Sequence, residues 1–324
     1  MVDVLDQKGH AAGNSFDNRG EARSVRLPGG YESKARHRAH KLAGNDVAIP
    51  VLASALIQRG FAVQFFKYEG LGNDFVVVDA SDEAVVSPER AVTICDRRFG
   101  VGADGVLLVL PSRKPDCDVR MRVLNADGSV PEMCGNGIRC VAVHVARARE
   151  QRGGSVRVET DAGASTCAIE DARGEGIVTV DMGVIRLFGD RAIDVDGRRV
   201  VVNVADAGNP HAVLFGTFSR GDVDHLGPRL ATHPDFPRGT NVEFSHIAGD
   251  GIDLIVWERG VGITLACGTG ACATAAVACA KGLVASGVPI AVRLPGGRLD
   301  VTIDGASRAT MRGPARFVFT GELK

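Results

Sequence analysis

The sequence predicts an α+β protein of two pseudo-symmetric α/β domains, each a curved mixed sheet wrapped around a central helix. Three observations predict this class. From residue 65 onward, short β-rich runs alternate with turns that contain Gly, Asn and Asp. Each set of strands holds one prominent helical pattern. Both helices begin at a Cys-Gly-x-Gly motif, "CGNG" and "CGTG". The repetition indicates a duplicated architecture, and the cleft between the two domains is the expected active site.

The strands of this prediction fall into two groups along the chain. The first group is predicted at Asp74–Ala80, Gly105–Leu110, Val119–Asn125, Ser155–Thr160 and Gly176–Gly183. The second group is predicted at Arg199–Ala205, His211–Phe215, Asn241–Ile247, Ile252–Glu258 and Ile290–Pro295. We therefore place an N-terminal domain at residues 65–181 and a C-terminal domain at residues 182–311. Residues 312–324 are expected to return to the N-terminal domain.

One helix belongs to each group. The first helix has apolar residues at helical spacing on one face, namely Ile138, Val141, Ala142, Val145 and Ala146. It carries arginines near its end and is expected to stop at Gly153-Gly154. The second helix, "ACATAAVACAKG", is small and apolar nearly all round, which favours a helix enclosed by sheet. Lys281 and Gly282 mark its expected end.

The first 64 residues differ from the rest and are expected to form a disordered extension. From Arg19 to Lys41 there are seven Lys or Arg against two acidic residues, with little periodicity. The run "VAIPVLASALI" imitates a signal peptide, but it contains Pro50 and follows too long a basic region. An extended start or an unstructured leader is the preferred interpretation.

Composition limits the partners and the compartment. The chain has 324 residues, of which 45% are hydrophobic and 24% charged, as in ordinary globular proteins. A formal net charge of −1 gives no reason to expect nucleic acid or an anionic membrane surface as a partner. No apolar run approaches the roughly 18 residues of a transmembrane helix.

Eight cysteines without a Cys-x-x-Cys pair indicate neither a disulfide scaffold nor a zinc site, so a cytoplasmic location is expected. Six of them are expected mostly in the core: Cys95, Cys117, Cys140, Cys167, Cys272 and Cys279.

The two remaining cysteines, Cys134 and Cys267, precede the helices and are the candidate catalytic residues. Free N–H groups and partial positive charge at a helix start favour a thiolate, so each cysteine is expected to titrate below about 8.5. The same N–H groups could hold a substrate carboxylate. Two such sites facing each other would place a sulfur on either side of one carbon. This geometry suits inversion at the α-carbon of an amino acid, with one cysteine as general base and the other as general acid.

A stabilised enolate-like carboxylate is needed for this reaction, and one well-placed donor is worth on the order of 3–4 kcal/mol. A single Cys-Gly-x-Gly is more often only a close-packed turn, and the presence of two favours function. From spacing alone, a redox dithiol and a phosphate cradle stay open.

The chain resembles the diaminopimelate epimerase family from about Phe65 to the C-terminus. The resemblance rests on "KYEGLGNDFVVVD", "NADGSVPEMCGNGIRC", "GNPHAV", "RGTNVEF" and "WERGVGITLACGTGAC", in this order. It implies cofactor-independent interconversion of LL- and meso-diaminopimelate, in lysine and peptidoglycan precursor biosynthesis. It also implies a homodimer, domain closure, no cofactor and no metal. Cys134 and Cys267 would be the two acid/base residues.

The resemblance assigns further residues to the substrate. It implies that Asn73, Asn125, Gly135, Asn136, Asn209, Asn241, Glu258, Arg259, Gly268 and Thr269 bind it. His211 is expected to support catalysis beside a thiol, coupled to Glu258. Without the resemblance, asparagines in turns would be taken for local backbone bonding, and Glu258-Arg259 for a surface pair.

Two positions depart from the family pattern. Many members have Glu where Ile263 stands, and some have Gln where Gly105 stands, so ligand contacts assigned to these positions are in doubt. The nearest rival is a proline or hydroxyproline racemase, in which a His typically follows the first Cys-Gly; Asn136 stands here. The phenazine-pathway isomerase lacks the cysteine pair. A non-catalytic anion-binding or thiol-redox protein is the alternative from another class.

Overall fold

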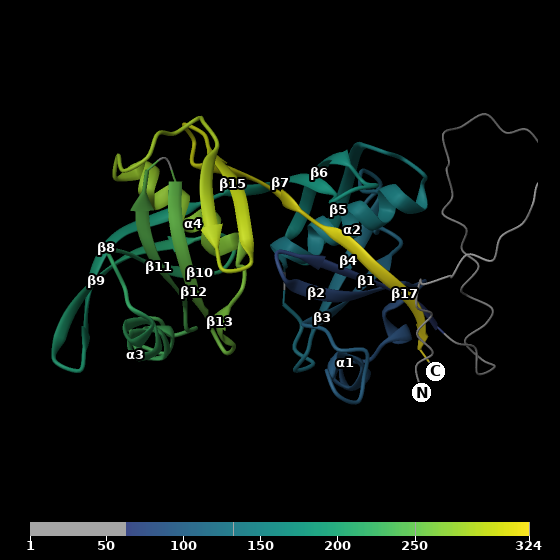
Figure 1. Cartoon of the computed structure of the whole chain (residues 1–324), viewed down its shortest axis with the longest axis horizontal. Coiled ribbons are helices and arrows are strands. Elements are labelled where there is room, and N and C mark those ends of the chain that lie inside the picture. Colours follow the sequence, from purple (N-terminus) through teal and green to yellow (C-terminus); the bar gives the residue numbers. More distant parts are fainter. Residues whose placement is uncertain (1–62, 132, 250, 324) are drawn as a thin grey trace, which may run out of the picture. The chain divides into compact units, whose positions relative to one another are not determined.

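A computed structural model describes residues 63–131, 133–249 and 251–323. The predicted extension therefore lies almost wholly outside the described residues. The described chain is a sheet-dominated α+β fold in which two helices are each surrounded by strands (Figure 1). The predicted fold class is confirmed.

The first half of the fold is built around helix α2 (Gly135–Ala148). Its strands are β1 (Val63–Gly70), β2 (Asn73–Asp79), β3 (Gly105–Leu110), β4 (Val119–Asn125), β5 (Gly154–Thr160), β6 (Gly163–Asp171) and β7 (Ile177–Val184). A 3-10 turn η1 (Glu83–Val85) and helix α1 (Pro88–Cys95) follow β2. The sheet is mixed, because β2–β3 and β4–β5 pair in parallel and the other neighbours are antiparallel.

The second half repeats this plan around helix α4 (Gly268–Ala280). Its strands are β8 (Arg186–Val195), β9 (Arg198–Asp206), β10 (Pro210–Phe215), β11 (Asn241–Ala248), β12 (Gly251–Glu258), β13 (Gly262–Thr264), β14 (Ile290–Leu294), β15 (Gly297–Ile303) and β16 (Arg308–Pro314). Helix α3 (Arg220–Ala231) precedes β11. The parallel pairs here are β10–β11 and β12–β14.

Both central helices are buried on nearly every side. In α2, every residue from Gly135 to Ala146 is buried, including the five predicted apolar positions. In α4, all residues from Gly270 to Ala278 are buried, and these are Gly, Ala, Cys, Thr and Val. Small side chains let strands approach an enclosed helix closely, which is why α4 has no polar face.

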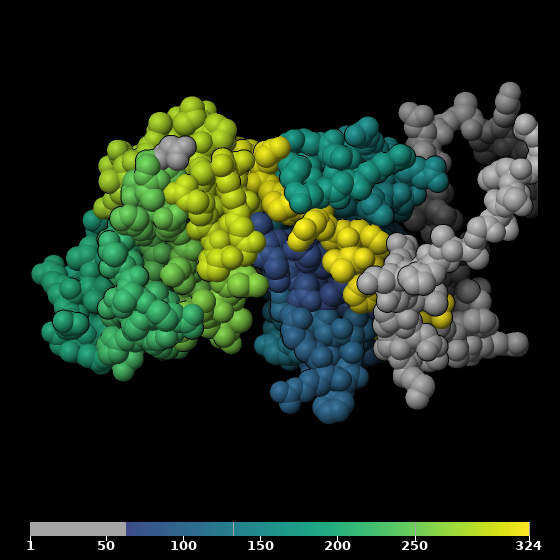
Figure 2. Space-filling view, in the orientation of Figure 1, coloured from purple at the N-terminus to yellow at the C-terminus, as the bar shows by residue number. Residues whose placement is uncertain are grey.

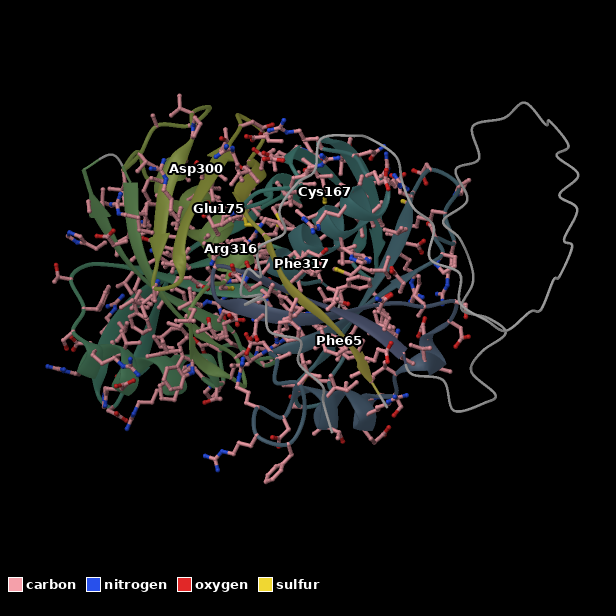
Figure 3. The ribbon with its side chains drawn as sticks, turned by 45° about the vertical axis from the view of Figure 1, so that its right-hand side comes forward. Phe65, Cys167, Glu175, Asp300, Arg316 and Phe317 are labelled. Atoms are coloured by element: carbon pink, nitrogen blue, oxygen red, sulfur yellow. The ribbon has the colours of Figure 1, made fainter. Side chains whose placement is uncertain are left out.

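The C-terminal strand β17 (Arg316–Leu323) joins the first half. It pairs antiparallel with β1, from Val63 opposite Leu323 onward. The Thr320 hydroxyl donates to the Phe65 carbonyl over 2.8 Å, and the Phe65 and Phe319 rings meet edge to face. In Figure 2 this strand, in yellow, lies among the blue and teal atoms of the first half, and Figure 3 labels Phe317 on it and Phe65 near it. Strand β16 pairs with both β15 and β7, so the last two strands link the halves.

The predicted strands coincide with observed ones to within a residue or two. The first predicted helix ends earlier than expected, at Ala148. The second ends where it was predicted to end, at Ala280, with Lys281 as its C-cap and Gly282 at φ 68°. Helices α1 and α3 were not predicted, nor were β1, β6, β8, β13 and β15–β17. Of the six cysteines expected mostly in the core, four are buried, while Cys117 and Cys279 are partly exposed. No helix in the described ranges is long and apolar enough to cross a membrane.

Candidate active site

The two Cys-Gly-x-Gly motifs adopt nearly the same local structure. Cys134 caps α2 with φ −137° and ψ 110°, and Cys267 caps α4 with φ −130° and ψ 108°. In each case the sulfur accepts a hydrogen bond from the N–H three residues on, Gly137 over 3.3 Å and Gly270 over 3.4 Å. A serine or aspartate oxygen commonly holds this capping position, so here each thiol takes the place of a cap.

The starts of α2 and α4 meet. A Cβ atom built on Gly135 would lie 3.5 Å from the Cα of Gly268, and one built on Gly268 would lie 3.6 Å from the Cα of Gly135. Met311 of β16 packs against both glycines. The absence of side chains at these two positions therefore lets the helix starts approach each other, and the free N–H groups of both helices are brought to one region.

The prediction that the two cysteines have lowered pKa values is wrong. Burial raises the pKa of the Cys134 thiol, and the Gly137 N–H only partly offsets this. Burial raises the pKa of Cys267 well above its ordinary value, and the nearby Glu258 carboxylate raises it further. The loss of hydration destabilises each thiolate more than the N–H groups of the first helical turn stabilise it. Burial therefore favours the thiol over the thiolate at both sulfurs.

Asn73 and Asn136 form a link between the halves at the start of α2. The Asn136 amide donates to Asn73 Oδ1 over 3.2 Å and to the carbonyl of Ala266 over 3.1 Å. Asn73 in turn donates to Asp104 Oδ2 over 2.7 Å. Ala266 directly precedes Cys267, so the side chain that follows the first motif holds the strand end that leads into the second motif.

His211 is fully buried and both of its ring nitrogens are occupied. Nδ1 lies 2.7 Å from Glu243 Oε1, and Nε2 lies 2.8 Å from Asn209 Oδ1. Its direct carboxylate partner is Glu243, whereas the expected partner was Glu258. Its Nε2 contact lets His211 orient Asn209, and its expected supporting role in catalysis stays a prediction.

Glu258 and Arg259 lie at the end of β12. Glu258 Oε1 accepts from the Thr264 hydroxyl over 2.6 Å, and burial raises the pKa of this carboxyl. The N–H of Arg259 donates to Asn241 Oδ1 over 2.9 Å, and its guanidinium donates to the carbonyl of Arg238. Asn241 therefore holds the peptide bond between Glu258 and Arg259 in place. The two residues are thus part of a bonded arrangement, whereas their spacing alone would indicate only a surface ion pair.

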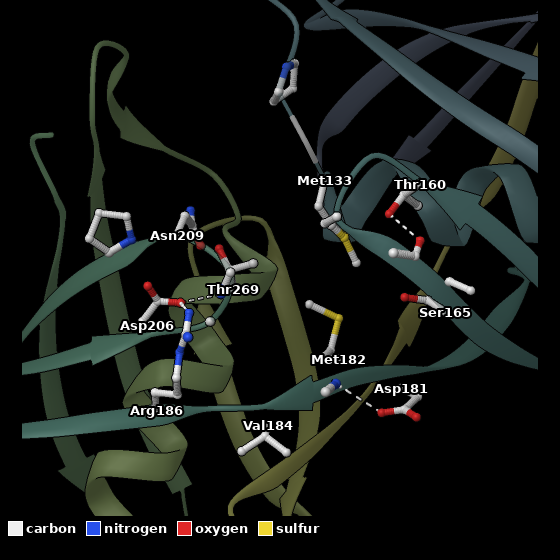
Figure 4. A pocket seen from close by; sticks show the side chains of 18 of the residues that line it. Met133, Thr160, Ser165, Asp181, Met182, Val184, Arg186, Asp206, Asn209 and Thr269 are labelled. Carbon is white, nitrogen blue, oxygen red and sulfur yellow. Dashed lines mark hydrogen bonds and ion pairs between the residues drawn. The ribbon is translucent and has the colours of Figure 1, made fainter.

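A pocket of about 550 Å³ opens beside the helix starts (Figure 4). Asn209 and Thr269 line one side and Met133 and Thr160 the other. Arg259 also lines it. The hydroxyl of Thr269 lies 3.5 Å from the sulfur of Cys267, so the pocket reaches the second motif.

Asn125 and the two departing positions lie apart from these contacts. The Asn125 amide donates to the Ser129 hydroxyl over 2.9 Å within its own turn. A Cβ atom on Gly105 would lie 2.9 Å from the carbonyl oxygen of Leu124, so a glutamine does not fit there without movement of β4. Ile263 is half-buried against the apolar cluster of the second half, where a glutamate would lose part of its hydration.

Sequence reasoning missed three polar residues that hold this site. Glu243 stands two positions after Asn241 on β11, and the period of a strand places both on one face. Asp104 holds Asn73, and Arg139 stands three residues after Asn136 on α2, which is helical spacing. The sequence shows the spacings of Glu243 and Arg139, but spacing alone does not tell whether a polar side chain is buried beside the site or exposed to solvent.

Solved structures of other proteins share this fold. A hydroxyproline epimerase from Agrobacterium vitis, with bound trans-4-hydroxy-L-proline, matches with a TM-score of 0.65 and 18% identity over 81% of this chain and 93% of that one. A phenazine biosynthesis protein from Bacillus anthracis matches with a TM-score of 0.62 and 16% identity over 82% and 99%. The fold is thus that of a class of epimerase and isomerase proteins.

Sequence comparison defines the family. The pattern described as diaminopimelate epimerase matches residues 65–188 and 203–318. A diaminopimelate epimerase of Gloeothece citriformis is 42% identical over 80% of this chain and 98% of its own length. Diaminopimelate epimerase 1 of a Nostoc species is 40% identical over 81% and 100%. The chain belongs to the diaminopimelate epimerase family and is an isomerase-type enzyme.

Proposed function

We propose that the protein interconverts LL- and meso-diaminopimelate without a cofactor, through Cys134 and Cys267. The observation that carries this proposal is the meeting of two matched helix starts, each capped by a thiol, beside a pocket of amino-acid size or larger. The family membership supports the substrate, and the reaction would serve lysine and peptidoglycan precursor biosynthesis.

The chemistry needs one sulfur in each protonation state. One thiolate takes the α-proton from its face of the substrate, and the electron pair moves into the α-carboxylate as an enolate-like dianion. The opposite thiol then gives its proton to the other face, and the two sulfurs leave with exchanged protonation states. The N–H groups of Gly135, Asn136, Gly268 and Thr269 would hold the carboxylate as its charge grows, because these residues form the first turns of the two helices.

The remaining residues are assigned to the two ends of the substrate. Glu258 would receive the ammonium group and Arg259 a carboxylate, since both lie at the end of β12. Asn73, Asn125, Asn209 and Asn241 would supply amide donors and acceptors to these zwitterions. His211 supports Asn209 from behind.

Assembly and location follow the family as proposals. We place the N-terminal domain at residues 65–181 with 312–324, the C-terminal domain at residues 182–311, and an extension at 1–64. The pairing of β17 with β1 supports the return of the C-terminus. A homodimer in the cytoplasm, acting on a small amino acid, completes the proposal.

The direct test is incubation of the purified full-length protein with LL-diaminopimelate in deuterium oxide, with no pyridoxal phosphate or metal added. We expect meso product that carries deuterium at the inverted α-carbon. Proline is the matched second substrate, because the racemase alternative has the same two-cysteine logic. Exchange with proline and none with diaminopimelate would overturn the substrate assignment in favour of that alternative. No exchange with either would overturn the reaction class.

A further inference from the structure

Arg139 is the largest fully buried side chain of the described chain, and its charge has only neutral neighbours. Nε donates to the carbonyl of Pro314 over 3.1 Å, Nη1 to the carbonyl of Gly135 over 3.1 Å, and Nη2 to Asn136 Oδ1 over 2.9 Å. Nη1 also lies 3.8 Å from the sulfur of Met311. A guanidinium stays protonated in proteins even though burial lowers the pKa of Arg139. A full positive charge is therefore buried without a bonded carboxylate.

The position of this charge is specific to the first motif. Arg139 bonds to Gly135 and Asn136, the two residues that follow Cys134. The α4 helix has the small residue Cys272 five positions after Cys267, where α2 has Arg139 five positions after Cys134. Burying a lone charge is costly unless a compensating charge appears nearby. A thiolate at Cys134 is a charge of the right sign at the adjacent helix start.

The second motif has a buried charge of opposite sign. Glu243 is fully buried on β11, and its Oε1 lies 3.0 Å from where a Cβ atom of Gly270 would be, so it packs on the first turn of α4. Its Oε2 has no hydrogen-bond partner within the described residues. A carboxylate at this place repels a second negative charge, so it disfavours a thiolate at Cys267 at the same helix start.

We propose that Arg139 is a positioning residue that makes Cys134 the first of the two thiols to ionise, while Glu243 keeps Cys267 protonated. The meaning of this order for turnover rests on the proposed function, because a two-thiol inversion needs one base and one acid. The unequal charges would set which sulfur is the base when substrate arrives.

The other charged groups near the sulfurs do not reverse this order. Glu258, on β12, lies near both sulfurs and disfavours a thiolate at each of them. His211, on β10, faces Glu243, with Nδ1 2.7 Å from Oε1. The Thr269 hydroxyl lies 3.5 Å from the Cys267 sulfur and favours a thiolate there, but burial with Glu258 and Glu243 outweighs it and the pKa of Cys267 stays raised. Arg139 therefore remains the cation that distinguishes Cys134 among the groups the structure describes.

The test is alkylation of the folded, full-length protein by iodoacetamide between pH 6.5 and 10, with the two cysteines followed separately by peptide mass spectrometry. The midpoint of each pH dependence is compared, because absolute rates also depend on exposure. In the wild type we expect the Cys134 midpoint to lie at least about one pH unit below that of Cys267, a tenfold difference in ionisation.

Four variants separate charge from structure. Arg139→Met should raise the Cys134 midpoint by about one unit, and Arg139→Lys, which keeps the charge, should return it to within a few tenths. Glu243→Gln, nearly isosteric, should lower the Cys267 midpoint by about one unit. Arg147→Met, on the same helix but at the surface, is the control and should change neither.

The proposal is overturned if the two wild-type midpoints coincide, if Arg139→Lys shifts Cys134 by a full unit, or if Glu243→Gln leaves Cys267 unchanged. Should Arg139→Met fail to fold, the lysine and glutamine variants decide alone. Because alkylation requires no substrate, this outcome is independent of whether the protein acts on diaminopimelate.

Discussion

The starts of α2 and α4 share a backbone but differ in what is buried behind them. The capping cysteines have φ and ψ values within about 10° of each other, and each sulfur accepts from the N–H three residues on. At the start of α2 the buried charged group is the guanidinium of Arg139, a residue of the same helix. At the start of α4 it is the carboxylate of Glu243 on β11. A duplicated fold thus provides two equal geometries, and the buried charges make their chemistry unequal.

The largest expected effect comes from loss of either sulfur. Cys134→Ala and Cys267→Ala should each lower inversion by at least about 10³-fold in both directions, because a general acid or base contributes 10²–10⁴ and both are needed in each turnover. The measurement is the rate of meso product from LL-diaminopimelate. Cys279→Ala, near the end of the same α4, is the control and should keep most activity. Retention of a tenth or more of the activity by either variant would show that its sulfur is not essential.

The second largest effect is expected at Asn136, whose side chain links the first motif to the segment before the second. Asn136→Ala removes the bonds to Ala266 and Asn73 and the bond that the side chain accepts from Arg139. It should lower kcat/KM by about 10- to 100-fold by loosening the reacting geometry. Circular dichroism should show an unchanged fold. Asn203→Ala, a buried asparagine elsewhere in the second half, serves as the matched control, since its amide bonds only to a carbonyl of β10. Equal losses in the two variants would indicate a general effect on stability.

The pH dependence tests the burial of both thiols. Because burial raises the pKa of each, the thiolate fraction of the unliganded protein should still be rising at pH 9, by nearly tenfold per unit between pH 7 and 8.5. Inactivation by iodoacetamide at low concentration follows this fraction. A plateau reached below pH 8 would show that the helix starts outweigh burial after all.

The smallest expected effect is a difference in stability between variants of Gly135 and Gly268, the two glycines at which the helix starts meet. A Cβ atom at Gly268 would come within 2.9 Å of the Met311 sulfur, whereas the closest approach at Gly135 is 3.4 Å, to the Cε of the same methionine. Gly268→Ala should therefore be less stable than Gly135→Ala by about 1 kcal/mol, as expected for mild overpacking. Urea denaturation measures this difference, and Met311→Ala should remove it. Equal stabilities of the two glycine variants would contradict the unequal packing.

The sequence predicted the frame of the fold better than its periphery. The two central helices were evident because apolar residues recur at helical spacing behind matching motifs. Helices α1 and α3 had signals that were not used, since Ser87-Pro88 and Ser219 with Asp222 are recognisable starts. Strands such as β8 are exposed along most of their length, so they lack the alternation that marks a half-buried strand.

The sequence suggests candidate substrate-binding residues, and these stay predictions. It does not suggest the buried residues that the structure places behind them, such as Glu243 and Arg139. Cys134 and Cys267 follow from local chemistry at a helix start, which sequence displays. Their raised pKa does not follow from it, because burial is produced by strands far away in the chain. The bond of His211 to Glu243 likewise depends on the parallel register of β10 and β11, which no local pattern reveals.

The most direct test of the central claim is a crystal structure of the protein with diaminopimelate bound in the closed state. The account predicts that the sulfurs of Cys134 and Cys267 lie on opposite faces of one α-carbon, each within roughly 3–4 Å of it, the range of reactive contacts. Sulfurs on the same face, or either sulfur well beyond that range, would contradict the account.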